Sequence, residues 1–206
     1  MASNVEIANR ALGELGGNKI TDLEEDSPEA RKINRVFVQV RDELLRRHRW
    51  NFAITRVALP AEVAVPVWGF TKAYPIPTDC LRLIEVNGSP DFRLERSPSG
   101  GGRAIVTDAA APIQIRYVMR ITDPNEFDVC FAALFAARLA QETAEDITGS
   151  NAKSDRLERW AKLALSEAKR LDAIEEPPEE LPDEGNWLAS REQGAGANNR
   201  RFFPIG

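Results

Sequence analysis

Apolar residues near the start of the chain recur at the spacing of an amphipathic helix. Ser3 and Glu6 are placed to form a capping box, so we expect this helix to begin at Ser3. Gly16 and Gly17 supply the positive-φ stop that commonly ends a helix. The face expected to be buried consists of Ala8, Ala11, Leu12 and Leu15.

A second helix is predicted to begin at Ser27, with Pro28 at its first position and Glu29 in its first turn. Its apolar face keeps the helical period, and its basic end complements the negative end of the helix dipole. The apolar residues are Ile33, Val36, Phe37, Val40 and Leu44, and the basic end comprises Arg46, Arg47, His48 and Arg49.

From Phe52 to Met119 the period changes, and prolines separate short runs rich in Val, Ile, Phe and Tyr. Because proline cannot donate a ladder hydrogen bond, these runs predict short strands divided by turns. Residues 97–102, SPSGGG, are typical of a flexible loop tip. The predicted strands cover residues 53–59, 70–76, 81–86, 92–95, 103–107 and 113–119.

Helical signals return at residues 123–126, where an aspartate, a proline and an acid form another cap. Residues 129–137 are apolar on nearly every side, so this third helix is expected to be the centre of a bundle and to end near Gly149. A fourth helix is predicted over residues 152–173, with Leu157, Trp160, Ala161, Ala164, Ala168 and Leu171 facing inward.

This order of elements predicts an α+β fold. We expect a four-helix bundle built from residues 1–50 and 121–174, with a small β-rich lobe, residues 51–120, inserted between helices two and three. The composition then changes, since EEPPEELPDEG holds six acids and three prolines. Such a stretch cannot bury a core, so residues 175–206 are predicted to form an extended C-terminal arm.

The charge, the apolar runs and the cysteines of the chain narrow the classes of function that it could have. The chain has 27 basic and 32 acidic residues and a net charge of -5, so a broad cationic face for DNA is not expected. No run approaches the ~18 apolar residues of a membrane span, and no membrane partner is expected. Cys80 and Cys130 predict two buried thiols rather than a disulfide framework or a zinc site.

Residues suited to catalysis are scarce. The only histidine is His48, and no phosphate loop, dinucleotide fingerprint or paired metal-ligand motif is present. Glu142, Glu145 and Asp146 could be imagined as a glycosidase pair, but acids on the late turns of a helix ordinarily form a solvated face. We therefore expect a protein that is not an enzyme and that uses neither metal nor cofactor.

Three stretches carry a family resemblance: ALGELGGNKITDLEEDSPEARKINRVF, VRDELLRRHRWNFA and AYPIPTDCLRLIEV. In this order they resemble the tail tubular protein A family, the head-to-tail adaptors of short-tailed bacteriophages and related prophages. The resemblance covers most of residues 4–120. Its most specific residues are Arg46, His48, Trp50, Asn51, Phe52 and Ala53, and then Tyr74, Ile76, Pro77, Asp79, Cys80, Leu81 and Arg82.

The resemblance implies a structural protein of the virion that assembles in the host cytoplasm. It implies a ring of identical subunits, usually twelve, docked under the portal protein and above the tail nozzle. Genome DNA would pass through the lumen during ejection without sequence-specific binding. The mild acidity of the chain fits such a conduit, because acidic groups repel the DNA backbone.

Two groups of residues are candidate sites. His48, Trp50, Asn51 and Phe52 are expected to form a structural junction between the bundle and the β lobe, because large apolar groups follow a basic helix end. The aromatic and basic residues of the arm are expected to bind the portal protein, with aromatics in apolar grooves and arginines on carboxylates or carbonyls. These residues are Trp187, Arg191, Arg200, Arg201, Phe202, Phe203 and Ile205.

Two alternatives of other classes stay open. A tail-associated cell-wall hydrolase of muramidase type would turn over peptidoglycan and lose that activity when Glu142 or Glu145 is replaced. A soluble helical interaction module from a prophage would stay monomeric and ignore portal protein.

Overall fold

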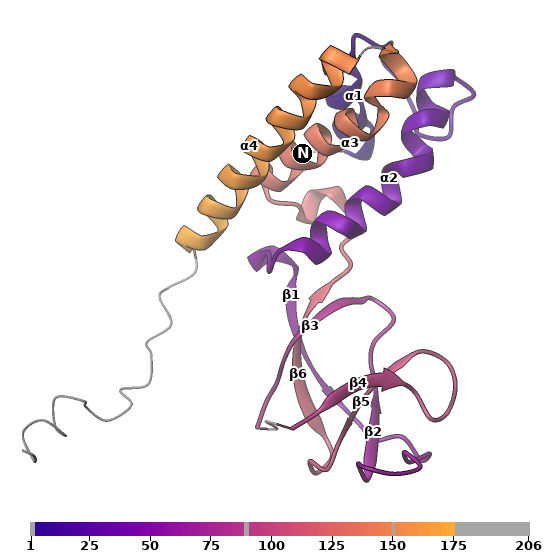
Figure 1. Cartoon of the computed structure of the whole chain (residues 1–206), viewed down its shortest axis with the longest axis vertical. Helices are drawn as coiled ribbons and strands as arrows, with labels where there is room; N and C mark the ends of the chain where they lie inside the picture. The colour runs from indigo at the N-terminus through magenta and orange to yellow at the C-terminus, as the bar shows by residue number, and fades with distance from the viewer. Residues whose placement is uncertain (1–2, 89–90, 150, 176–206) are drawn as a thin grey trace, which may run out of the picture. The chain divides into compact units, whose positions relative to one another are not determined.

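The computed structural model of this chain describes residues 3–88, 91–149 and 151–175. Over these residues the protein is mixed α+β, with four α-helices and two three-stranded antiparallel sheets (Figure 1). The helices are α1 (Asn4–Leu15), α2 (Pro28–Arg47), α3 (Val129–Thr148) and α4 (Asn151–Glu175). The strands are β1 (Ile54–Leu59), β2 (Lys72–Pro75), β3 (Cys80–Val86), β4 (Arg93–Arg96), β5 (Arg103–Thr107) and β6 (Ile113–Met119).

The caps predicted for the first two helices are confirmed. Ser3 Oγ accepts a hydrogen bond from Glu6 N at 3.0 Å, while Glu6 Oε2 accepts one from Ser3 N at 2.8 Å. Gly16 ends α1 with a left-handed φ of 72°, a conformation in which a side chain would be strained. Ser27 caps α2 by accepting from Ala30 N at 3.2 Å.

The predicted start of the third helix is wrong by five residues or so. Asp123 caps only a single 3-10 turn, Pro124–Glu126, and the chain then extends through Phe127. The cap of α3 is Asp128, whose Oδ1 accepts from Cys130 N at 2.7 Å and from Phe131 N at 3.2 Å. Two caps in succession allow Phe127 to turn into the core, where it is 8% exposed.

One hydrophobic cluster gathers residues from all four helices of the described chain. Helix α3 packs against α1, α2 and α4, as its apolar sequence predicts. Val129 is an exception, because it lies in the first turn of α3 and is 80% exposed. On α4, Leu157, Ala161 and Ala168 are buried, whereas Trp160, Ala164 and Leu171 are only partly buried.

The six predicted strands are confirmed, with ends that move by at most two residues. The first sheet has the order β1-β6-β3 and the second has the order β2-β5-β4. A second hydrophobic cluster joins residues of the two sheets. Residues 97–102 form a hydrogen-bonded turn rather than a free loop tip, since Ser97 N donates to Gly102 O at 2.9 Å and the Ser97 side chain is bound by Glu62.

Candidate functional site

The segment that links α2 to β1 is built around a buried tryptophan. Trp50 is 1% exposed, and its indole Nε1 donates to the carbonyl of Leu44 at 2.8 Å. Its ring meets His48 edge-on at 4.8 Å and Phe131 of α3 at 5.2 Å between ring centroids. Phe52 contacts Phe131 as well but is only partly buried, so the two aromatics of this segment contribute unequally to the core.

Asp172 of α4 completes this junction. Its Oδ2 lies 3.0 Å from His48 Nε2, and its Oδ1 accepts from Asn51 N at 2.9 Å. The Asn51 side-chain amide donates to the Asp172 carbonyl at 2.8 Å. With its side chain 10% exposed, this aspartate binds the end of α2 to the late turns of α4. The sequence placed His48 at the junction but did not reveal its carboxylate partner.

The third stretch of the family resemblance meets the second. Arg46 Nη1 donates to the carbonyl of Leu81, which fastens the end of α2 to β3. The neighbouring Asp79 carbonyl accepts from Arg120 N at 2.8 Å, and its carboxylate lies 3.3 Å from the Tyr117 hydroxyl. Burial, with the nearby Asp79 charge as a smaller cause, raises the pKa of Tyr117 to about 12. These contacts hold structure rather than forming a reactive centre.

The two cysteines differ from the prediction that both are buried. Cys80 is buried, and desolvation raises the pKa of its thiol. Cys130 lies in the first turn of α3 and is only partly buried, and desolvation also raises the pKa of its thiol. A raised pKa keeps a thiol protonated and weakly nucleophilic, so neither cysteine has the electrostatic setting of a reactive one.

The acids weighed as a glycosidase pair lie on the exposed late turns of α3. Glu142 binds Arg138 at 2.6 Å, one helical turn away, and Asp146 forms an ion pair with Arg35 of α2. Glu145 is exposed. Within residues 3–88, 91–149 and 151–175, no cluster of three or more His, Cys, Asp and Glu side chains could hold a metal ion.

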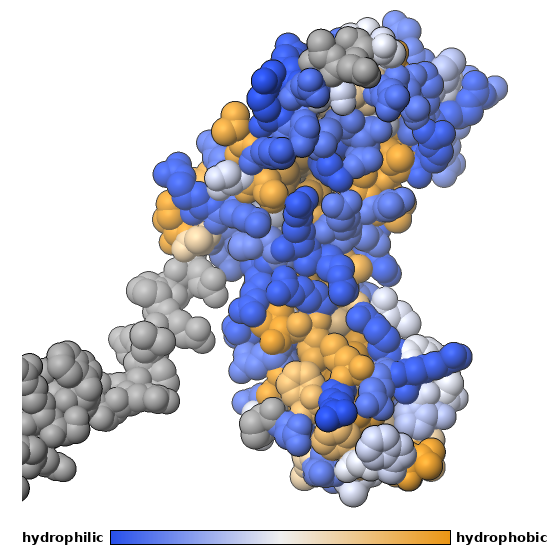
Figure 2. Space-filling view, in the orientation of Figure 1, coloured by the Kyte–Doolittle hydropathy of each residue, from blue (hydrophilic) through white to orange (hydrophobic). Residues whose placement is uncertain are grey.

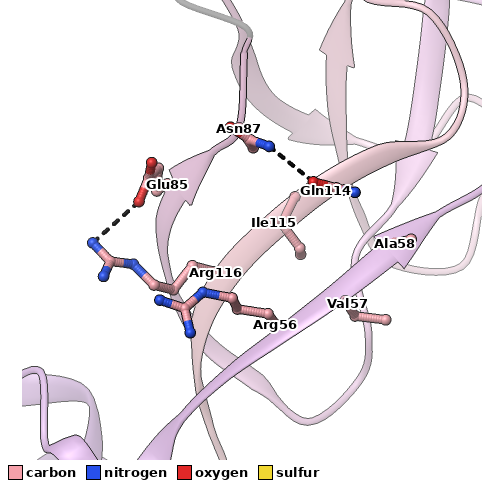
Figure 3. A pocket seen from close by; sticks show the side chains of 8 residues that line it. All are labelled: Arg56, Val57, Ala58, Glu85, Asn87, Gln114, Ile115 and Arg116. Atoms are coloured by element: carbon pink, nitrogen blue, oxygen red, sulfur yellow. Dashed lines mark hydrogen bonds and ion pairs between the residues drawn. The ribbon is translucent and has the colours of Figure 1, made fainter.

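A hollow of about 490 Å³ is lined by residues of the first sheet and of the turn that follows β3. Val57, Ala58 and Ile115 contribute apolar surface, and Arg56 and Arg116 are direct cross-strand partners of β1 and β6. Figure 3 shows Arg116 reaching Glu85, at 3.1 Å, and Asn87 donating to Gln114, at 2.8 Å. We call the surface lined by these eight residues the sheet hollow.

The connection between β1 and β2 presents hydrophobic side chains to solvent. Val63 and Val67 are 101% and 100% exposed, Trp68 is 83% exposed and Val65 is 57% exposed. Figure 2 shows hydrophobic surface on this face of the strand region. We call residues 63–68 the apolar loop. Large apolar groups that lie together on a surface mark a site of interaction, and no pattern in the strand prediction had singled out this loop.

The candidate portal-binding residues lie outside the described residues: Trp187, Arg191, Arg200, Arg201, Phe202, Phe203 and Ile205. None of the helices in the described part of the chain combines the length and apolar composition that a bilayer span requires. The fold and the junction thus define a mixed α+β protein. No protein-family model matches the chain, and no curated protein matches it significantly.

Proposed function

We propose that this chain is a head-to-tail adaptor of a short-tailed bacteriophage. The observation that carries the proposal is the convergence of the two most specific stretches of the resemblance. Arg46 binds Leu81, and Trp50, His48 and Asn51 tie the same helix end to α3 and α4. The residues that resemble the adaptor family are therefore the residues that join the helical part of the chain to its strands.

The proposed architecture is a four-helix bundle with the β lobe inserted between α2 and α3. The shared hydrophobic cluster of the four helices supports the bundle, and the connection from Arg47 to Ile54 supports the insertion. In the assembled virion, identical copies form a ring, usually of twelve, between the portal protein and the tail nozzle. Genome DNA leaves through the lumen, where the acidity of the chain limits adhesion to phosphate.

Attachment to the portal is assigned to residues 175–206. The segment combines an acidic, proline-rich stretch with the terminal run RRFFPIG. Proline-rich chains extend by about 3.1 Å per residue, so such an arm can reach across a neighbouring subunit. Several arms on one ring act together, and avidity then replaces strong single contacts.

Electron microscopy of the purified protein, with and without portal protein of the same phage, tests this proposal. We expect single copies at nanomolar concentration and rings only on the portal, because an adaptor must join after DNA is packaged. A stable ring of free protein at nanomolar concentration would contradict this order of assembly. Failure to bind the portal would reject the adaptor function itself and favour the soluble interaction module.

A further inference from the structure

The residues that flank the apolar loop are held by hydrogen bonds at both ends. Glu62 N donates to Ala73 O at 2.7 Å, and the Glu62 carboxylate accepts from the Ser97 hydroxyl at 2.8 Å. At the other end, Thr71 N and Oγ1 both donate to Asp108 Oδ1 at 2.8 Å. A surface that is ordered before binding loses less conformational freedom on association.

The sheet hollow contains hydrogen-bond donors that lack partners. Among the described residues the side chain of Arg56 makes no ion pair or hydrogen bond, and the Nε of Arg116 is buried without a hydrogen-bond partner. A buried donor without an acceptor is costly, and native proteins rarely leave one unmatched. Guanidinium groups also bind the faces of tryptophan rings and accept close apolar contact along their stems.

The apolar loop carries the complementary groups. Trp68 offers an exposed indole ring for an arginine to stack on. Between Val63 and Gly69, the described backbone makes no hydrogen bond to other backbone groups, so its carbonyl groups are not engaged as acceptors there. Acceptors and an aromatic face on the loop therefore match donors and apolar stems in the hollow.

The charges around the two surfaces also differ in sign. The surface beside Trp68 has one more acidic than basic side chain, whereas the sheet hollow has one more basic than acidic side chain. Opposite charge at two surfaces steers their encounter and suppresses like-with-like pairing. The charged residues beside Trp68 are Asp91, Glu95, Asp108, Arg93 and Arg96, and those in the hollow are Arg56, Arg116 and Glu85.

We propose that the apolar loop of one copy docks into the sheet hollow of a second copy of this chain. Two different surfaces of the same chain then meet, so each contact leaves one loop and one hollow free for further copies. A heterologous contact of this kind, in which two different surfaces meet, closes into a ring when the rotation between copies permits. The inference rests on the proposed function and assigns the lateral contact of the ring.

One such contact is weak. Stable interfaces bury at least ~1,000 Å², and a single loop of six residues covers less than that. We therefore expect single copies at nanomolar concentration. Association through the loop and the hollow should appear only at concentrations on the order of several hundred micromolar. On a portal, the high local concentration of copies makes the same weak contact sufficient.

Sedimentation velocity of the full chain over this range of concentration tests the proposal. A loop variant combines Val67→Ser with Trp68→Ser, and a hollow variant carries Arg56→Glu. Both sets of changes lie on exposed positions, so circular dichroism should stay unchanged. Each variant alone should associate at least about tenfold more weakly than the unaltered chain, the loss expected on removing a central anchor. A control variant, Leu163→Ser on exposed surface of α4, should associate as the unaltered chain does.

Mixing the two variants gives the decisive measurement. The hollow variant keeps its loop and the loop variant keeps its hollow, so the mixture should form pairs of chains and nothing larger. Pairs that grow into longer assemblies, a mixture without pairs, or an unaltered chain that stays monomeric at every concentration each overturn the inference. Rings of the loop variant on the portal would also overturn it while leaving the adaptor function intact. Self-association through the loop without portal binding would support the lateral contact and reject the adaptor function.

Discussion

Replacing Asp172 with alanine should destabilise the protein more than any other single change to a charged side chain of α4. The carboxylate lies within hydrogen-bond distance of His48 Nε2, at 3.0 Å, and of Asn51 N, at 2.9 Å. Its side chain is only 10% exposed, so water cannot readily take its place. The alanine variant therefore removes two contacts that fasten the end of α2 to α4.

The expected cost follows from these contacts. A hydrogen bond to a charged group contributes about 1.5–3 kcal/mol, and a buried donor left without an acceptor costs about 1–3 kcal/mol. The two losses share one carboxylate and do not add fully, so we expect the free energy of unfolding to fall by roughly 2–4 kcal/mol. For a chain of this size, that change lowers Tm on the order of 10 °C.

Denaturant unfolding, followed by circular dichroism, measures this free energy, and hydrogen exchange at the Asn51 amide reports the local loss. Asp172→Asn keeps an acceptor for Asn51 N–H and should cost about 1 kcal/mol. Asp155→Ala on the exposed face of α4 serves as the matched control and should change stability by less than about 0.5 kcal/mol. An unfolding midpoint of Asp172→Ala equal to that of the control would refute the role of the junction.

Three further predictions concern other parts of the chain. Trp50→Ala should lower the free energy of unfolding by about 3–5 kcal/mol because it empties a buried site, and an unchanged melting midpoint would refute this. Because the pKa of Tyr117 is raised to about 12, the fold favours the neutral phenol, and stability should fall as pH rises from about 10 to about 12. In the Tyr117→Phe variant this loss of stability at alkaline pH should be smaller. If the variant and the unaltered chain show the same dependence of stability on pH, the effect of Tyr117 is refuted. Deleting residues 187–206 should leave the helical circular dichroism unchanged and abolish portal attachment, whereas undiminished portal affinity would show that the arm is dispensable.

The elements predicted most accurately are those that local chemistry determines. The capping box at Ser3, the proline start after Ser27 and the stop at Gly149 all depend on neighbours within a few residues. The strands were equally clear because prolines and glycines bound each apolar run. The start of α3 was misplaced because Asp123 and Asp128 both satisfy the rule for a cap, and only burial of Phe127 decides between them.

Contacts between distant residues could not be predicted in the same way. Asp172 lies 121 residues after Asn51, and an aspartate among the charges of an exposed-looking helix carries no sign that it is buried. The sheet hollow depends on the pairing of β1 with β6, which no local pattern determines. The apolar loop was visible as valines around Pro66, but apolar residues ordinarily predict burial, and only the structure shows that these are exposed.

The residues that resemble the adaptor family act inside the protein, where they determine how its helices join its strands. Trp50 fills the core, Arg46 binds the Leu81 carbonyl, and Asp79 binds the backbone of Arg120. Partner choice must instead depend on exposed groups, because only these meet another molecule. Among the described residues, the apolar loop and the sheet hollow meet that condition, so changes there should alter assembly while stability is kept, and changes at the junction should do the opposite.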